Sequence, residues 1–72
     1  MEINNYEFRL DTHYDSVLYS TFKFNNALEA VNAFNKCKDW GTAENVATYN
    51  LYEPNGKCHT RNYYRNGIVS GR

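Results

Sequence analysis

Two cysteines and two histidines are the side chains of this chain whose types could carry nucleophilic or metal chemistry: Cys37, Cys58, His13 and His59. A Cys–His nucleophilic pair needs side chains that converge. Adjacent residues on a strand point to opposite faces, so Cys58 and His59 cannot form it if they lie on a strand. The sequence leaves two other Cys–His pairs open: Cys37 with His59, and Cys58 with His13. The spacing does not resemble a zinc motif, in which two ligand cysteines lie a few residues apart.

The sequence also lacks the motifs that mark common enzymes: a glycine-rich phosphate loop, His-Glu-x-x-His and Gly-x-Ser-x-Gly. A chain of 72 residues predicts a single domain over residues 1–72. A domain of this size buries only about 60% of the surface that its unfolded chain exposes, which leaves little material for a deep, dry active site. We therefore expect a non-enzymatic binding protein with no catalytic residue, metal or cofactor.

The cellular setting follows from two further patterns. No apolar run approaches the ~18 residues that span a membrane, and the start of the chain has no signal-peptide pattern. We therefore expect a cytoplasmic protein without membrane contact. Cytosolic cysteines are normally reduced, so Cys37 and Cys58 are expected to be buried free thiols. A disulfide between them is the alternative, and it requires Cα atoms within about 7 Å.

Charge is distributed unevenly along the chain. Residues 1–53 hold all eight acidic side chains and four basic ones, and residues 54–72 hold four basic side chains and no acidic one. The first part therefore carries −4 and the second +4. A basic segment with tyrosines between its charges is typical of sites that bind phosphate or an acidic protein surface. A solvated sheet face is the alternative interpretation.

Hydrophobic alternation predicts two strands in the first third of the chain. The first covers residues 3–10 and the second residues 17–24. The polar segment 11–16 between them is predicted to be a hairpin loop. The second strand is expected to place three apolar side chains on one face: Leu18, Phe22 and Phe24.

The apolar period then changes to that of a helix, predicted over residues 26–39. Asn26, with Glu29 three residues later, is typical of a helix start with a capping box. An apolar stripe follows at three- and four-residue steps: Ala27, Ala30, Val31, Phe34 and Cys37. Gly41 is expected to end the helix in a left-handed conformation. The ring of Trp40 is expected to fold over the edge of the core.

Two more strands are predicted over residues 46–53 and 57–65. Pro54-Asn55-Gly56 between them is a strong tight-turn signal, and Glu53 with Lys57 is expected to form an opposite-charge pair across that turn. Asn66-Gly67 is a second turn signal, after which a short last strand or a frayed tail is expected.

This order of elements predicts an α+β fold. Its antiparallel sheet would have about four strands, in the order strand, strand, helix, strand, strand, with the helix packed on one face. The other face is then left to water or to a partner.

Alternation along the last predicted strand places five side chains on one face: Lys57, His59, Arg61, Tyr63 and Arg65. Because this set holds every charge of the strand, we expect it on the exposed face, bordered by Tyr49 and Leu51. Arginine offers a planar fork for carboxylate or phosphate, and tyrosine offers rigid contact area. We call the predicted partner-binding set the Tyr/Arg platform: Tyr49, Lys57, His59, Arg61, Tyr63 and Arg65.

One segment carries a resemblance to a known group of proteins. A strand runs directly into a capped helix at Phe22-Lys23-Phe24-Asn25-Asn26-Ala27-Leu28-Glu29-Ala30, and a terminal hairpin follows around Pro54-Asn55-Gly56. In this style, over roughly residues 17–65, the chain resembles small phage-encoded anti-CRISPR proteins with a sheet and one helix. That group shares no catalytic residues, so none is carried over.

The resemblance implies an inhibitor in the host cytoplasm. Such a protein occupies the surface of a host defence protein of the CRISPR type, or of a protein–nucleic-acid complex, and blocks its nucleic-acid binding or activation. The alternative is a nucleic-acid-binding module that uses the basic C-terminal hairpin and stacks unpaired bases on its tyrosines. A homodimer is a further alternative, because a thin core and spare aromatic side chains favour self-association.

Overall fold

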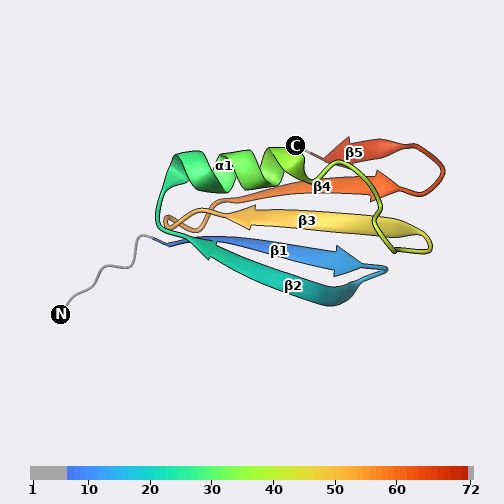
Figure 1. The fold of residues 1–72 in the computed structure, drawn as a ribbon, viewed down its shortest axis with the longest axis horizontal. Helices are drawn as coiled ribbons and strands as arrows, with labels where there is room; N and C mark the ends of the chain where they lie inside the picture. Colours follow the sequence, from blue (N-terminus) through green and yellow to red (C-terminus); the bar gives the residue numbers. More distant parts are fainter. Residues whose placement is uncertain (1–6, 72) are drawn as a thin grey trace.

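The computed structural model describes residues 7–71. It contains five strands, β1 (Phe8–Tyr14), β2 (Val17–Phe24), β3 (Val46–Tyr52), β4 (Cys58–Tyr64) and β5 (Val69–Gly71), and one helix, α1 (Ala27–Lys36). The strands form one antiparallel sheet in the order β2-β1-β3-β4-β5, with α1 on one face (Figure 1). The predicted α+β class is confirmed. The sheet has five strands because the segment after Asn66-Gly67 pairs with β4 as a short last strand.

The first hairpin differs from its prediction. Strand β1 continues to Tyr14, so the predicted loop over 11–16 is wrong, while residues 3–6 of the predicted first strand lie outside the described residues. The turn consists of Asp15 and Ser16, whose φ angles of 53° and 72° suit a two-residue hairpin turn. Asp11 belongs to the strand in spite of its charge, because its carboxylate accepts a hydrogen bond from Thr21 and contacts Arg9.

Asp15 also ties the hairpin to the start of β3. Its carboxylate accepts hydrogen bonds from three successive backbone N–H groups, those of Glu44 (2.7 Å), Asn45 (2.8 Å) and Val46 (3.1 Å). These bonds favour the charged form, and the bond from Glu44 is the largest cause of the lowered pKa of Asp15. The ionised carboxylate thus holds together two segments about thirty residues apart in sequence.

We predict that Asp15→Asn destabilises the fold at neutral pH. A carboxyl group whose pKa is lower in the folded chain stabilises that chain above its unfolded pKa, near 3.8, and the effect is lost as pH falls toward the folded value. The melting temperatures of wild type and variant should therefore differ at pH 7 and converge below about pH 4. Thermal denaturation by circular dichroism between pH 7 and pH 2.5 measures this, with Glu44→Gln as the charge-matched control. A difference that stays constant over this range would contradict the assigned role.

Helix α1 begins where the sequence predicts. The side chain of Asn26 accepts hydrogen bonds from the backbone N–H groups of Leu28 (2.8 Å) and Glu29 (3.1 Å). The helix ends at Lys36, earlier than predicted, because the backbone at Cys37 is extended. Gly41 therefore does not end the helix, although its φ of 56° is left-handed as expected. With ten residues, α1 cannot cross a membrane, and no other helix lies within residues 7–71.

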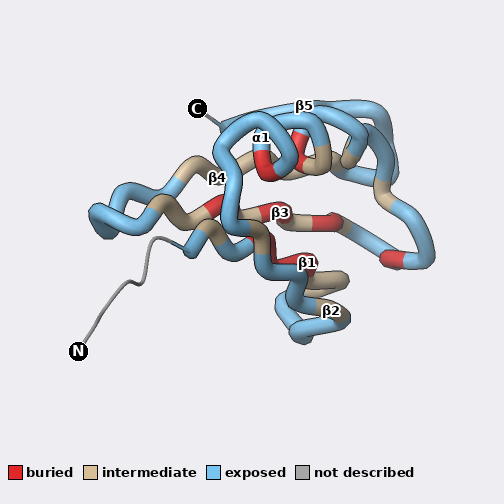
Figure 2. Tube along the Cα trace, turned by 60° about the vertical axis from the view of Figure 1, so that its left-hand side comes forward, coloured by how far each residue is buried: buried red, intermediate tan, exposed pale blue. Residues whose placement is uncertain are grey.

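The core lies between α1 and the first three strands of the sheet. Helix α1 packs against β1, β2 and β3, and Figure 2 shows buried positions on α1, β1 and β3. The buried apolar residues are Leu10, Ala30, Phe34, Ala43, Ala47, Tyr49 and Leu51. From the predicted helix stripe, only Ala30 and Phe34 are buried; Val31 is 43% exposed. Trp40 packs partly buried against this core, as predicted.

The β3–β4 hairpin has the turn expected at Pro54-Asn55-Gly56, where Gly56 has a φ of 93°. Glu53 and Lys57 do lie across this turn from each other, where the Glu53 N–H donates to the Lys57 carbonyl at 2.8 Å, but their side chains form no ion pair in the described part of the chain. Glu53 instead contacts His59, with 2.5 Å between Oε2 and Nε2. The register brings His59 within reach, since His59 pairs with Leu51 and Glu53 follows Leu51 on the same side of the chain.

Candidate functional site

The Tyr/Arg platform lies on the face of the sheet that α1 covers. The β3–β4 register pairs Tyr49 with Arg61 and Ala47 with Tyr63, so the predicted side chains do share one face. That face is not open, however, because Tyr49 is only 5% exposed and its hydroxyl donates a hydrogen bond to the Asp39 carbonyl at 2.7 Å. Burial is the main cause that raises the pKa of the Tyr49 hydroxyl, which therefore keeps its proton at neutral pH. The predicted exposure is therefore wrong for Tyr49, whereas Arg61 and Tyr63 are half-buried.

Arg61 and Tyr63 complete this inward-facing layer. The Arg61 guanidinium lies 4.2 Å from the centre of the Phe34 ring and donates a hydrogen bond to the Asn35 side chain at 3.1 Å. Tyr63 meets Tyr49 edge to face, with 5.7 Å between ring centres. A charged residue fits here because the face of an aromatic ring attracts a guanidinium group, which can still donate hydrogen bonds at its edge.

The other three platform residues lie at the two ends of β4. Lys57 is exposed next to the β3–β4 turn, His59 contacts Glu53, and Arg65 donates a hydrogen bond to the Ala43 carbonyl beyond the opposite end of β4. Arg65 is therefore at the opposite end of the strand from Lys57 and His59. A partner contact by Lys57 or Arg65 stays a prediction.

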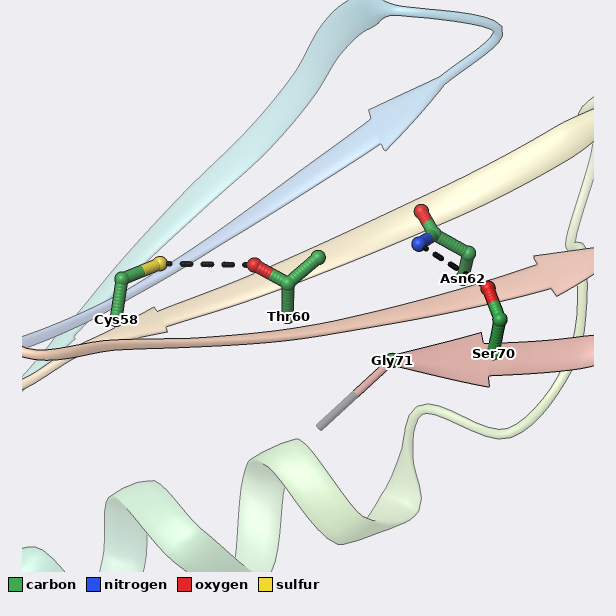
Figure 3. A pocket seen from close by; sticks show the side chains of 5 residues that line it. All are labelled: Cys58, Thr60, Asn62, Ser70 and Gly71. Atoms are coloured by element: carbon green, nitrogen blue, oxygen red, sulfur yellow. Dashed lines mark hydrogen bonds between the residues drawn. The ribbon is translucent and has the colours of Figure 1, made fainter.

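The face away from α1 carries small polar side chains instead. They hydrogen-bond across the strands, Thr48 to Asn62 and Thr60 to Asn50, both at 2.7 Å. Figure 3 shows the pocket beside them on β4 and β5, which has a volume of about 510 Å³; the Asn62 side chain lies 3.5 Å from the Ser70 hydroxyl there. These groups largely satisfy each other. At one end of the same face, the Arg9 guanidinium lies 4.4 Å from the centre of the Tyr52 ring, so an arginine and a tyrosine do meet there.

Both cysteines are free. Cys37 is half-buried and its thiol donates to the Ala33 carbonyl at 3.4 Å, while Cys58 is exposed, against the expectation of a buried thiol. Burial raises the pKa of the Cys37 thiol, so it is protonated and a poor nucleophile at neutral pH. Neither open Cys–His pair is hydrogen-bonded in the described chain, and no three potential metal ligands cluster there.

Exposed apolar side chains gather on strand β2. It is the first strand of the sheet and has a neighbour, β1, on one side only among the described residues. Four large side chains of this eight-residue strand are exposed: Val17 (68%), Leu18 (55%), Tyr19 (67%) and Phe22 (53%). We call this strand with its outward backbone the β2 edge. An edge strand presents unpaired N–H and C=O groups, and one with apolar side chains is a template for another strand.

A cleft opens beside the β2 edge, where α1 ends above the sheet. Its volume is about 320 Å³. Aromatic side chains form much of its wall, and Tyr14 and Tyr19 stack within it with ring centres 4.7 Å apart. We call it the α1–β2 cleft, and its lining includes Tyr14, Tyr19, Phe22, Tyr49, Lys36 and Lys38.

A bulge in β2 shapes this cleft. Ser20 pairs with Thr12 and Leu18 pairs with His13, which leaves Tyr19 as the extra residue in β2. Leu18 therefore lies on the face opposite Phe22, and the prediction that the two share a face is wrong. The bulge places both Tyr19 and Ser20 in the lining of the cleft.

No protein-family model, no curated protein and no solved structure matches this chain. Its functional surface must therefore be argued from its own geometry. Within residues 7–71, that geometry favours the β2 edge and the α1–β2 cleft, which together combine exposed apolar side chains, an unpaired strand edge and a concave wall.

Sequence reasoning missed this surface. Strand β2 was predicted with the correct bounds, but its edge position depends on the pairing of β1 with β3, which local alternation does not reveal. The available signal was the composition of residues 17–24, which include four large apolar side chains besides Phe24, and a single charge, Lys23.

Proposed function

We propose that this chain is a small non-enzymatic binding protein that inhibits a protein partner by pairing its β2 edge with a strand of that partner. The observation that carries the proposal is the concentration of exposed apolar side chains on an edge strand. Strand addition obtains affinity from main-chain hydrogen bonds and specificity from pockets for alternate side chains. The α1–β2 cleft offers such a pocket directly beside the edge.

The partner class comes from the resemblance to anti-CRISPR proteins. We propose a host defence protein of the CRISPR type, whose nucleic-acid binding or activation would be blocked by the bound chain. The alternative of a nucleic-acid-binding module has weaker support, because Arg61 and Arg65 are engaged within the chain and Lys57 lies at the other end of β4 from Arg65.

A plaquing assay tests the proposal. Bacteria that carry one CRISPR system each, with a spacer against a test phage, would express the chain, and plaques would be counted. We expect plaquing to rise by several orders of magnitude in at least one system. Phe22→Lys should abolish this rise, because it places a charge where a partner strand would pack. Ile68→Lys is the matched control, since Ile68 has a similar exposure of 58% but precedes the opposite edge strand, β5.

Two results would count against the proposal. One is unchanged plaquing in every CRISPR system tested, with the chain shown by immunoblot to be expressed. The other is full inhibition by Phe22→Lys, with native circular dichroism, because an inhibitor that tolerates this change does not use the β2 edge.

A further inference from the structure

The α1–β2 cleft lies where side chains of an added strand would point. A strand paired with β2 would run about 4.8 Å from it, and every second side chain would lie on the α1 side of the sheet. A residue opposite Phe22 or Ser20 would then have its Cβ within about 5.5 Å of theirs. Both residues line the cleft.

The size and wall of the cleft suit one large apolar side chain. Its volume of about 320 Å³ lies at the low end of the range for ligand pockets, which is roughly 300–1,000 Å³. Tyr19 and Phe22 are both more than half exposed, so an inserted ring or branched aliphatic chain would cover apolar surface that now faces water.

The charge around the cleft favours a partner that is acidic. Lys36 and Lys38 line it and are exposed, and Asp39 is the one acidic residue that residues 7–71 contribute to the lining. The Asp39 carboxylate already accepts a hydrogen bond from the Gly41 N–H at 2.7 Å. Neither lysine takes part in an ion pair among the described residues, and β2 contains no acidic residue. Lys36 also lies in the last turn of α1, where a cation stabilises the helix end.

From this combination we propose that the strand that pairs with β2 is acidic: it inserts an aromatic or large aliphatic side chain into the α1–β2 cleft and places carboxylates against Lys36 and Lys38. This inference rests on the proposed function and specifies the chemistry of the partner segment. Carboxylates opposite exposed lysines would mainly set specificity and association rate, while the apolar anchor would supply most of the affinity.

A peptide selection tests the inference without knowledge of the partner. The probe is a display library of random twelve-residue peptides, selected on the immobilised full-length chain at low salt. We expect enriched peptides to carry Phe, Tyr, Leu or Ile with Asp or Glu within two positions. Binding of a synthetic enriched peptide, measured by fluorescence anisotropy, should weaken as salt rises.

Variants of the chain then locate the bound peptide. The double variant Lys36→Glu, Lys38→Glu should weaken binding by about tenfold, because two attractive contacts become repulsive. Val69→Glu is the control, because it places a negative charge at an exposed position on the opposite edge strand, β5, and it should leave the affinity unchanged. Phe22→Lys should abolish binding.

Several outcomes would overturn the inference: no enrichment, enriched peptides without acidic residues, or equal affinity for the double lysine variant. A second copy of the chain as occupant is tested by light scattering, and a dimer that becomes monomeric in Phe22→Lys would also overturn it. Peptides that lack acids but still lose binding in Phe22→Lys would leave strand addition intact and refute only the acidic chemistry. The plaquing assay uses no peptide, so it tests the inhibitory function independently of the acidic partner strand.

Discussion

Replacing Phe34 by alanine is expected to destabilise the fold by about 3–5 kcal/mol, the usual cost of removing a buried ring. Phe34 is only 4% exposed and is the largest side chain that α1 contributes to the core. It also supports the Arg61 guanidinium, which lies over its ring. A single core in a domain of this size supplies roughly 3–5 kcal/mol in total. A large fraction of the variant should therefore be unfolded at room temperature.

Urea denaturation followed by circular dichroism measures this effect. Leu28→Ala is the matched control, because it removes a large apolar side chain from the same helix at a position that is 68% exposed. Its cost should stay within about 0.5 kcal/mol, as is usual for surface substitutions. Equal losses of unfolding free energy in the two variants would show that α1 does not pack against the sheet through Phe34.

Replacing Gly41 by alanine should cost roughly 2–5 kcal/mol for two separate reasons. The φ of Gly41 is 56°, a left-handed conformation that costs a residue with a Cβ about 1–2 kcal/mol. An added Cβ would also lie 2.4 Å from the Tyr14 hydroxyl oxygen and 2.8 Å from its Cζ. Overpacking of this kind typically costs about 1–3 kcal/mol. Relief by movement of Tyr14 would disturb its stacking with Tyr19 in the α1–β2 cleft.

Chemical denaturation of three further variants separates these causes. Gly56→Ala shares the positive φ, at 93°, but its Cβ would meet no atom within 4 Å, so it isolates the backbone cost. Tyr14→Ala alone and combined with Gly41→Ala completes a double-mutant cycle, in which we expect a coupling of about 1–3 kcal/mol. A Gly41→Ala cost no larger than that of Gly56→Ala, together with additive losses in the cycle, would rule out the steric contact.

Local patterns in the sequence determined the elements of this protein. The bounds of β2, the Asn26 cap of α1, the turn at Pro54-Asn55-Gly56 and the α+β class were all predicted from spacing and turn chemistry. These features depend on contacts between residues close in sequence, and a sequence pattern records such contacts directly. The bounds of β1 were predicted poorly. Hydrogen bonds of Asp11 and Asp15 to residues distant in sequence stabilise a segment whose composition is typical of a polar loop.

Tertiary structure alone decided which surfaces are free. Alternation correctly grouped Tyr49, Arg61 and Tyr63 on one face, but a period of two does not say which face the helix covers. The helix covers their face, and its contacts with β1, β2 and β3 leave β4 at its margin, where the guanidinium group of Arg61 can lie over the Phe34 ring. The exposed β2 edge and its cleft arise in the same way, from strand order and a single bulge at Tyr19. Strand order is set by pairing between distant segments, so the local composition shows that residues 17–24 are apolar but not that they form the edge of the sheet.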